Sequence, residues 1–326
     1  MRTTLAVTTA ATLAATLATA GGDLGRVAVY MNAAKADATR RAYAADWRAF
    51  AAWCATDGGD PSAPQTVARY FADLADQGTA PSTIERRAVG LRVELRSRGI
   101  EEAITHAAVR ETLKGIRRTV GRATRRQAAP LLADATRAIA TELAKTAGLK
   151  ATRDRALILL GFSTACRESE LCALTVADLT FNADGVTVTV RRSKTDQDGE
   201  GRRVGVPFGR TAETCPVRAV RAWLDASGII EGPAFRAVTR HGRLATTALS
   251  TRAVDDIVRH AAAAAGLDAA HFSGHSMRAG LATSAARAGV PEASIMRQTG
   301  HRSLTMVRRY IREGELYRDN AAAGLL

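Results

Sequence analysis

Six side chains in the second part of this 326-residue sequence have the types that phosphoryl transfer would need. Such a reaction needs a nucleophile, cationic groups for the phosphate oxygens and an acid for the leaving oxygen. A tyrosine hydroxyl can attack, arginines can clamp the oxygens, and a lysine or histidine can move protons. Without metals, all positive charge must come from side chains. The candidates are Arg167, Lys194, His275, Arg278, His301 and Tyr310.

Arg167 lies between the apolar residues Phe162 and Leu171, so we expect it to be partly buried and to need an acidic partner or an anion. Glu170 follows three residues later, on the same face of a predicted helix. A purely structural Arg–Glu pair is the simpler reading of this motif taken alone.

His275 and Arg278 are three residues apart, which places them side by side on one helix face. His301 precedes a predicted helix that Ser303 can cap and that carries Tyr310. Each motif is weak by itself, because surface His–Arg pairs are common and a lone tyrosine usually lies at an amphipathic edge.

The elements that must position these residues divide into two regions. Residues 34–121 show four helical patterns with arginines on several faces, separated by Gly and Pro turns. The polar, basic segment 122–130 is a predicted linker, and residues 1–33 are a predicted N-terminal extension. We therefore expect an all-α N-terminal domain over 34–121 and a second domain over 131–326.

The second domain is predicted to be mainly α-helical with a small β-sheet, an α+β fold. Residues 186–190 and 203–206 alternate between apolar and polar, which indicates a hairpin with Lys194 at the start of its long tip. All later elements have helical patterns, at 216–226, 250–265, 275–288, 291–298 and 303–313.

The charge balance indicates a polyanionic partner, most commonly nucleic acid. The formal net charge is +14, and residues 1–126 and 127–326 each contribute half of it. Hydrophobic residues make up 46% of the chain, too many for a disordered protein. The four cysteines lack CxxC spacing, so we expect reduced thiols, no zinc site and a cytoplasmic protein. Residues 1–20 superficially resemble a secretory signal, but threonines interrupt their apolar run.

Taken in order, Arg167, Lys194 on a hairpin, His275 with Arg278, Gly300-His301 and Tyr310 resemble the tyrosine recombinase (phage integrase) family. The resemblance covers residues 130–326 in register and 37–121 more loosely. The segments 249–253 and 273–276 are similar to Cre-type members. His301 stands where Cre-type proteins have tryptophan, although most of the family has histidine there. Cys166 stands where an aliphatic residue is frequent.

The resemblance implies a role for each candidate. Tyr310 would attack the DNA phosphorus to form a 3′-phosphotyrosine, with His275 as base and later as acid. Arg167, Arg278 and His301 would hold the non-bridging oxygens. Lys194 would protonate the leaving 5′-oxygen, and Glu170 would orient the site. Because the covalent intermediate conserves bond energy, neither a metal nor ATP is implied, and no cofactor is expected.

The resemblance also implies a partner and an assembly. Residues 34–121 would form a SAM-like core-binding domain that closes with the catalytic domain as a C-shaped clamp on double-stranded DNA. A solution monomer would assemble as a homotetramer on two inverted-repeat sites and pass through a Holliday junction. The tail that ends at Leu326 would dock on a neighbouring protomer or fold back on its own domain. The chain would be nucleoid-associated in a bacterium.

Base contacts are assigned on weaker grounds. Arg252 matches a guanine-reading residue of Cre-type proteins, and Arg–guanine pairing is the commonest direct contact. The third predicted helix carries further, weaker candidates for contact with a base or a phosphate, namely Thr83, Arg86 and Arg87. Most exposed arginines touch only phosphate or water.

Three other readings remain open at this point. A type IB topoisomerase shares the chemistry but needs no defined site, and a non-catalytic DNA-binding protein could retain a vestigial site. A metal-dependent nuclease would need ligand spacing that Asp255, Asp256 and the other acids do not show.

Overall fold

The computed structural model describes residues 36–121, 128–191 and 201–301, together with Arg26, Val29, Tyr30, 303–305, 307, 308 and 310. The chain divides into two compact units, Met1–Arg125 and Arg126–Leu326, and the division falls inside the segment predicted as a linker. Ala129 already donates a backbone hydrogen bond to the carbonyl of His271 (2.7 Å), so the end of that segment packs on the second unit. No described helix is long and apolar enough to span a membrane.

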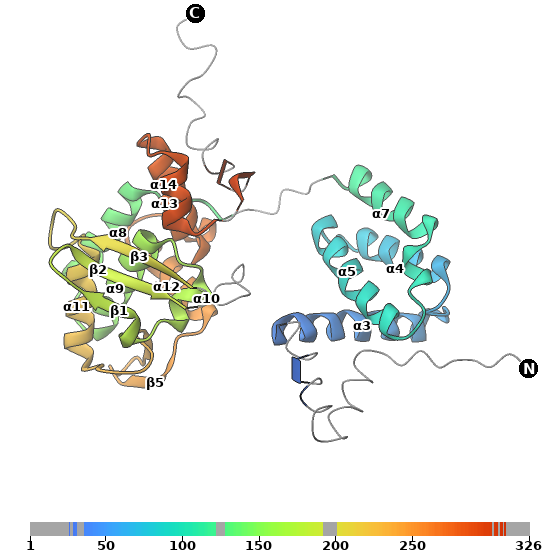
Figure 1. Ribbon diagram of the computed structural model, residues 1–326, viewed down its shortest axis with the longest axis horizontal. Coiled ribbons are helices and arrows are strands. Elements are labelled where there is room, and N and C mark those ends of the chain that lie inside the picture. Colours follow the sequence, from blue (N-terminus) through green and yellow to red (C-terminus); the bar gives the residue numbers. More distant parts are fainter. Residues whose placement is uncertain are drawn as a thin grey trace, which may run out of the picture. The chain divides into compact units, whose positions relative to one another are not determined.

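The first unit is built from helices (Figure 1), with bounds α3 Asp37–Asp57, α4 Pro64–Asp76, α5 Pro81–Ser97, α6 Glu102–Thr105 and α7 Ala107–Thr119. Proline opens both α4 and α5, where its missing N–H costs nothing. Gly58, in the left-handed conformation at φ 74°, ends α3. Buried aromatic and aliphatic side chains form its core, among them Phe50, Phe71 and Leu95. The predicted helices are confirmed, and the short α6 is an element that the sequence pattern did not indicate.

The second unit opens with helices α8 (Ala133–Lys145), α9 (Leu149–Thr164) and α10 (Glu168–Ala173), followed by the one-turn helix η1 (Val176–Asp178). Strands β1 (Leu179–Phe181), β2 (Gly185–Val190) and β3 (Arg202–Pro207) form an antiparallel sheet with β2 in the centre. In that sheet Val188 pairs with Leu179 on one side and Val204 on the other. The sheet packs on α9 and on α11 (Pro216–Ser227) (Figure 1).

The predicted hairpin is therefore confirmed, but the prediction that only helices follow it is wrong. Strands β4 (Arg236–Val238) and β5 (Leu244–Ala248) form a second antiparallel pair. Their side chains are exposed or half-buried, so the strands lack the apolar alternation that marks a half-buried strand. Then come α12 (Thr251–Ala264), η2 (Ala269–His271), α13 (His275–Arg287) and α14 (Glu292–Thr299). Leu304, Thr305, Val307, Arg308 and Tyr310 are also helical.

One close backbone approach fixes α13 in this unit. A Cβ atom on Gly280 would lie 1.8 Å from the carbonyl oxygen of Leu131, so only glycine allows this packing. Met277 of the same helix is fully buried against Gly161 of α9. Because α13 carries His275 and Arg278, these contacts set where both side chains lie.

Candidate active site

The site begins where α9 ends. Ala165 adopts the left-handed conformation (φ 48°), which residues other than glycine rarely adopt. This turn directs the Ala165 carbonyl toward Arg278, whose Nη1 donates to it at 2.6 Å. It also lets the chain reverse into α10, with Arg167 as the N-cap residue.

Glu170 lies in the centre of the site, and only 2% of its side chain is exposed. Its carboxylate accepts a hydrogen bond from Arg167 Nη1 at 2.5 Å and another from the Arg167 backbone N–H at 3.1 Å. Arg202 Nη2 contacts the same carboxylate at 3.3 Å. The expected Arg167–Glu170 pair is present, and a second arginine shares its acid.

Arg202 is the functional residue that the sequence reasoning missed. Its Nη1 donates to the carbonyl of Gln298 at 2.8 Å, at the end of α14, and its Nη2 lies 3.8 Å from Cys166 Sγ. A sequence signal existed, because Arg202 shares the face of β3 on which Val204 and Val206 are buried. The predicted strand began at Arg203, one residue too late to include it.

Arg278 is buried, and one of its guanidinium nitrogens makes no hydrogen bond to the described residues. Only 1% of the residue is exposed, and Nη1 donates to the carbonyls of Ala165 (2.6 Å) and Thr299 (2.5 Å). Nη2 has no hydrogen-bond partner within the described part of the chain. Burial, and next the charge of Arg167, lower the pKa of Arg278 to about 10, so it remains charged at neutral pH. A buried donor of this kind is costly unless an anion completes it.

His275 and Tyr310 form a hydrogen bond, with 3.1 Å between Nε2 and Oη. Tyr310 is 3% exposed and packs with apolar residues that include Ala282 and Val307. Burial, followed by the charges of Arg278 and Arg167, lowers the pKa of His275 from 6.5, so the imidazole is neutral at neutral pH. A neutral Nε2 can accept the phenolic proton if Nδ1 carries the ring hydrogen.

His301 lies against the same tyrosine, with ring centroids 5.9 Å apart. Its Nδ1 hydrogen-bonds the hydroxyl of Thr299 at 2.7 Å. Burial, together with the charge of Arg278, lowers the pKa of His301 to about 4. The Thr299 hydroxyl donates its proton to the carbonyl of Ile295 at 2.7 Å, so it accepts a hydrogen bond from Nδ1–H of His301. His301 can donate to an anion through Nε2 only when the Thr299 proton turns to Nδ1 and the ring hydrogen moves to Nε2.

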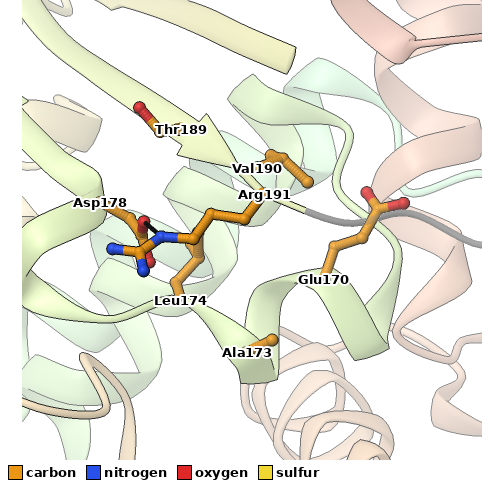
Figure 2. A pocket seen from close by; sticks show the side chains of 7 residues that line it. All are labelled: Glu170, Ala173, Leu174, Asp178, Thr189, Val190 and Arg191. Carbon is orange, nitrogen blue, oxygen red and sulfur yellow. Dashed lines mark hydrogen bonds and ion pairs between the residues drawn. The ribbon is translucent and has the colours of Figure 1, made fainter. Parts of the chain in front are cut away.

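Lys194 lies outside the described residues, but the strand ends on either side of its segment are placed. Arg191 directly follows β2, and its Nε contacts the carboxylate of Asp178 at 2.5 Å. Figure 2 shows Arg191 and Glu170 lining one pocket of about 410 Å³. Arg202, paired with Val190 across the sheet, reaches Glu170 directly. The base of the hairpin that carries Lys194 is thus part of the site.

The four candidate DNA contacts lie elsewhere. Arg252 is exposed in the first turn of α12. In the first unit, Arg86 makes a two-bonded ion pair with the buried Asp46, at 2.5 and 2.6 Å, and keeps 47% of its side chain exposed. Arg87 is half-buried and interacts with Tyr70, and Thr83 is half-buried in the first turn of α5. Arg86 therefore presents a guanidinium that is already oriented, whereas Arg87 and Thr83 are less accessible.

Within the described residues, no group of three or more His, Cys, Asp or Glu side chains could hold a metal ion. The four cysteines are unpaired thiols, as expected. Asp255 and Asp256, the acids considered for a nuclease, lie on α12 and do not join such a group.

Comparisons with known sequences bear on what this site does. The model of the phage integrase family matches residues 130–315. The chain is 40% identical over 296 residues to a Selenomonas ruminantium protein named integrase/recombinase xerD homolog, covering 89% of this chain and 86% of that protein. It is 27% identical over 283 residues to recombinase Cre of Escherichia phage P1, covering 81% of each chain.

Solved structures share the fold. The Tn1549 transposon integrase, in complex with a circular intermediate DNA, matches with a TM-score of 0.62 at 14% identity, covering 96% of this chain and 99% of that one. The XerH site-specific recombinase, bound to a palindromic difH substrate after cleavage, matches with a TM-score of 0.59 at 18% identity, covering 81% and 72%.

Proposed function

The chain belongs to the phage integrase family and is a site-specific tyrosine recombinase, and we propose that it cleaves and rejoins DNA through a covalent bond to Tyr310. The observation that carries this proposal is the Tyr310–His275 hydrogen bond, which lies beside the buried Arg278, whose Nη2 has no hydrogen-bond partner among the described residues. The resemblance expected from the sequence, including the likeness to Cre, is confirmed.

The first step is attack by the Tyr310 oxygen on the scissile phosphorus. A free phenol loses its proton only near pH 10, so the reaction needs a base. His275 Nε2, 3.1 Å away and neutral, takes that proton as the O–P bond forms. The bond from phosphorus to the 5′-oxygen breaks, and Lys194 gives that oxygen its proton. Rejoining is the reverse, with the 5′-hydroxyl as nucleophile and Tyr310 as leaving group.

The charge of the site supports this chemistry. Three guanidinium groups, Arg167, Arg202 and Arg278, surround one buried carboxylate, that of Glu170, which leaves two positive charges in excess. The five-coordinate transition state carries about one more negative charge than the ground-state diester, and cations already in place stabilise it selectively. Arg167 and Arg278 Nη2 hold the non-bridging oxygens, and His301 adds a donor when its ring hydrogen is on Nε2.

Recombination, rather than the relaxation of supercoils, is the function that the relatives favour, since those reported above are named recombinases or an integrase. We assign residues 34–121 to core binding, 122–130 to the linker and 131–326 to catalysis, closing as a C-shaped clamp on duplex DNA. Four protomers would act on two inverted-repeat sites through a Holliday junction, with the protein acting on the nucleoid in the cytoplasm. The net charge of +14 supports a DNA partner.

A covalent-adduct assay tests the proposed function. The protein is incubated in EDTA with nicked duplexes from the DNA beside its own gene, or from a randomised-site selection. We expect an SDS-stable protein–DNA adduct, and peptide mapping should locate it at Tyr310. If specific binding is detected but no adduct forms on any nicked duplex, the protein is a non-catalytic DNA-binding protein and the proposal is wrong.

The pH profile of cleavage should have its acid limb below pH 6.5. The reaction needs neutral His275, whose pKa in the folded protein is lowered from 6.5. The neutral form therefore persists as the pH falls past 6.5 and is lost only as it falls through the lowered pKa. Single-turnover adduct formation from pH 5 to 8 measures this. An acid limb centred at or above pH 7 would contradict the assignment of His275.

Arg252→Ala should relax sequence preference more than it weakens overall binding. An exposed arginine in the first turn of α12 can pair with one guanine, and each such pair contributes about 1–3 kcal/mol of discrimination. Binding is measured on the selected site, on single-base variants and on random duplex. Preference should fall by about 10-fold or more at one position. An equal loss of affinity on every sequence would show that Arg252 contacts only phosphate.

A further inference from the structure

Two carboxyl side chains from other helices hold the beginning of α13. Its N-cap residue is Gly274, which has no side chain to satisfy the free amide groups of the first turn. Asp255 of α12 accepts a hydrogen bond from the Gly274 N–H at 2.8 Å. Glu168, the first residue of α10, fills the adjacent space, since a Cβ on Gly274 would lie 2.5 Å from its Cγ and 2.9 Å from its Oε1.

The two carboxyl groups also interact with each other. Burial, followed by the charge of Asp255, raises the pKa of Glu168, and a hydrogen bond between the two carboxyl groups adds to this. The backbone N–H of His275 acts in the opposite direction, as does Arg259 of α12. On α10, Cys172 is nearby, and burial together with Glu168 raises its pKa to about 11. Glu168 therefore binds a proton more tightly than a free glutamate side chain would.

His275 is the catalytic group most sensitive to this arrangement. It directly follows Gly274, and its Nε2 must stay within hydrogen-bond reach of Tyr310 Oη. Arg278, one turn later, is held independently by the carbonyls of Ala165 and Thr299. Loss of either carboxyl group that contacts Gly274 would therefore displace the imidazole of His275 and leave the guanidinium of Arg278 in place.

We propose that Asp255 and Glu168 are positioning residues, which orient the first turn of α13 so that His275 can take the proton of Tyr310. This inference rests on the proposed roles of His275 and Tyr310. Asp255 follows Arg252 by three residues on α12. Helix α12, which carries the proposed contact of Arg252 with a DNA base, thus also holds α13, which carries the proton acceptor His275.

The test is a double-mutant cycle on single-turnover adduct formation, with saturating nicked duplex from the adduct assay. Asp255→Ala should slow adduct formation by about 100-fold, as expected for a catalytic group displaced by about 1 Å. Its affinity for the duplex should stay within about twofold, since the lost contact is not to phosphate. Asp255→Asn keeps an oxygen that accepts the Gly274 N–H and should recover most of the rate.

The decisive comparison is with His275→Ala. If Asp255 acts through His275, Asp255→Ala/His275→Ala should be no slower than His275→Ala alone, because coupled losses do not add. Losses that multiply would show that Asp255 acts elsewhere and would overturn the inference. The matched control is Asp256→Ala, which removes a half-exposed acid paired with Arg259 on the same helix and should leave the rate unchanged.

Failure of the inference and failure of the proposed function give different results. A wild-type protein that binds its site and forms no adduct overturns both. A wild-type adduct with an unimpaired Asp255→Ala overturns the inference alone. Thermal melting checks that each variant is folded. If Asp255→Ala is unfolded, Glu168→Ala takes its place in the cycle, with the same expected non-additivity toward His275→Ala.

Discussion

Tyr310→Phe is expected to bind its DNA site normally and to form no covalent adduct. The substitution removes one oxygen from a residue that is 3% exposed, so the phenyl group keeps the packing with Val307 and loses the hydrogen bond to His275. Without that oxygen the variant lacks the nucleophile of the proposed mechanism. Adduct formation should fall by at least about 10⁴-fold, the scale of losses on removal of a covalent nucleophile.

The measurement is SDS-resistant adduct on nicked duplex, with binding to the same duplex followed by fluorescence anisotropy. Tyr30→Phe is the matched control, since it removes the same atom from an exposed tyrosine outside the site and should react like the wild type. An adduct formed by Tyr310→Phe at more than a small fraction of the wild-type rate would assign the nucleophile to another residue. Unchanged DNA affinity in the variant separates loss of chemistry from loss of binding.

The residues of the site could be predicted from the sequence because they occur in short segments with fixed local geometry. His275 and Arg278 share a helix face at three-residue spacing, and Arg167 and Glu170 do the same at the start of α10. The structure brings both pairs together with His301 and Tyr310. Lys194 stays a prediction, because it lies outside the described residues.

The parts that the sequence did not indicate depend on long-range packing. Arg202 reaches Glu170 across 32 residues and Gln298 across 96, and no local pattern specifies such partners. Strands β4 and β5 pair with each other, and their side chains are exposed or half-buried, so their sequence carries no burial pattern. The ion pair of the buried Asp46 with Arg86 also joins two helices, across 40 residues, and no local pattern indicates it.

Arg278→Lys is expected to slow cleavage by about 10²–10³-fold, the usual cost of one lost transition-state donor. The guanidinium uses Nη1 for the carbonyls of Ala165 and Thr299 and keeps Nη2 for the phosphate. A lysine has one ammonium group and cannot span both functions. Burial also lowers a lysine pKa, so part of the variant would be neutral and present no charge at all.

The loss should appear in the rate at saturating DNA, with little change in affinity, because the unused donor matters most when charge develops on the phosphate. Single-turnover adduct formation against DNA concentration separates the two quantities. Arg137→Lys is the control, since it makes the same change at an exposed arginine on α8 that pairs with the exposed Asp134. If Arg278→Lys cleaved within about threefold of the wild-type rate, the bidentate geometry would be unnecessary, and a positive charge alone would account for the role of Arg278.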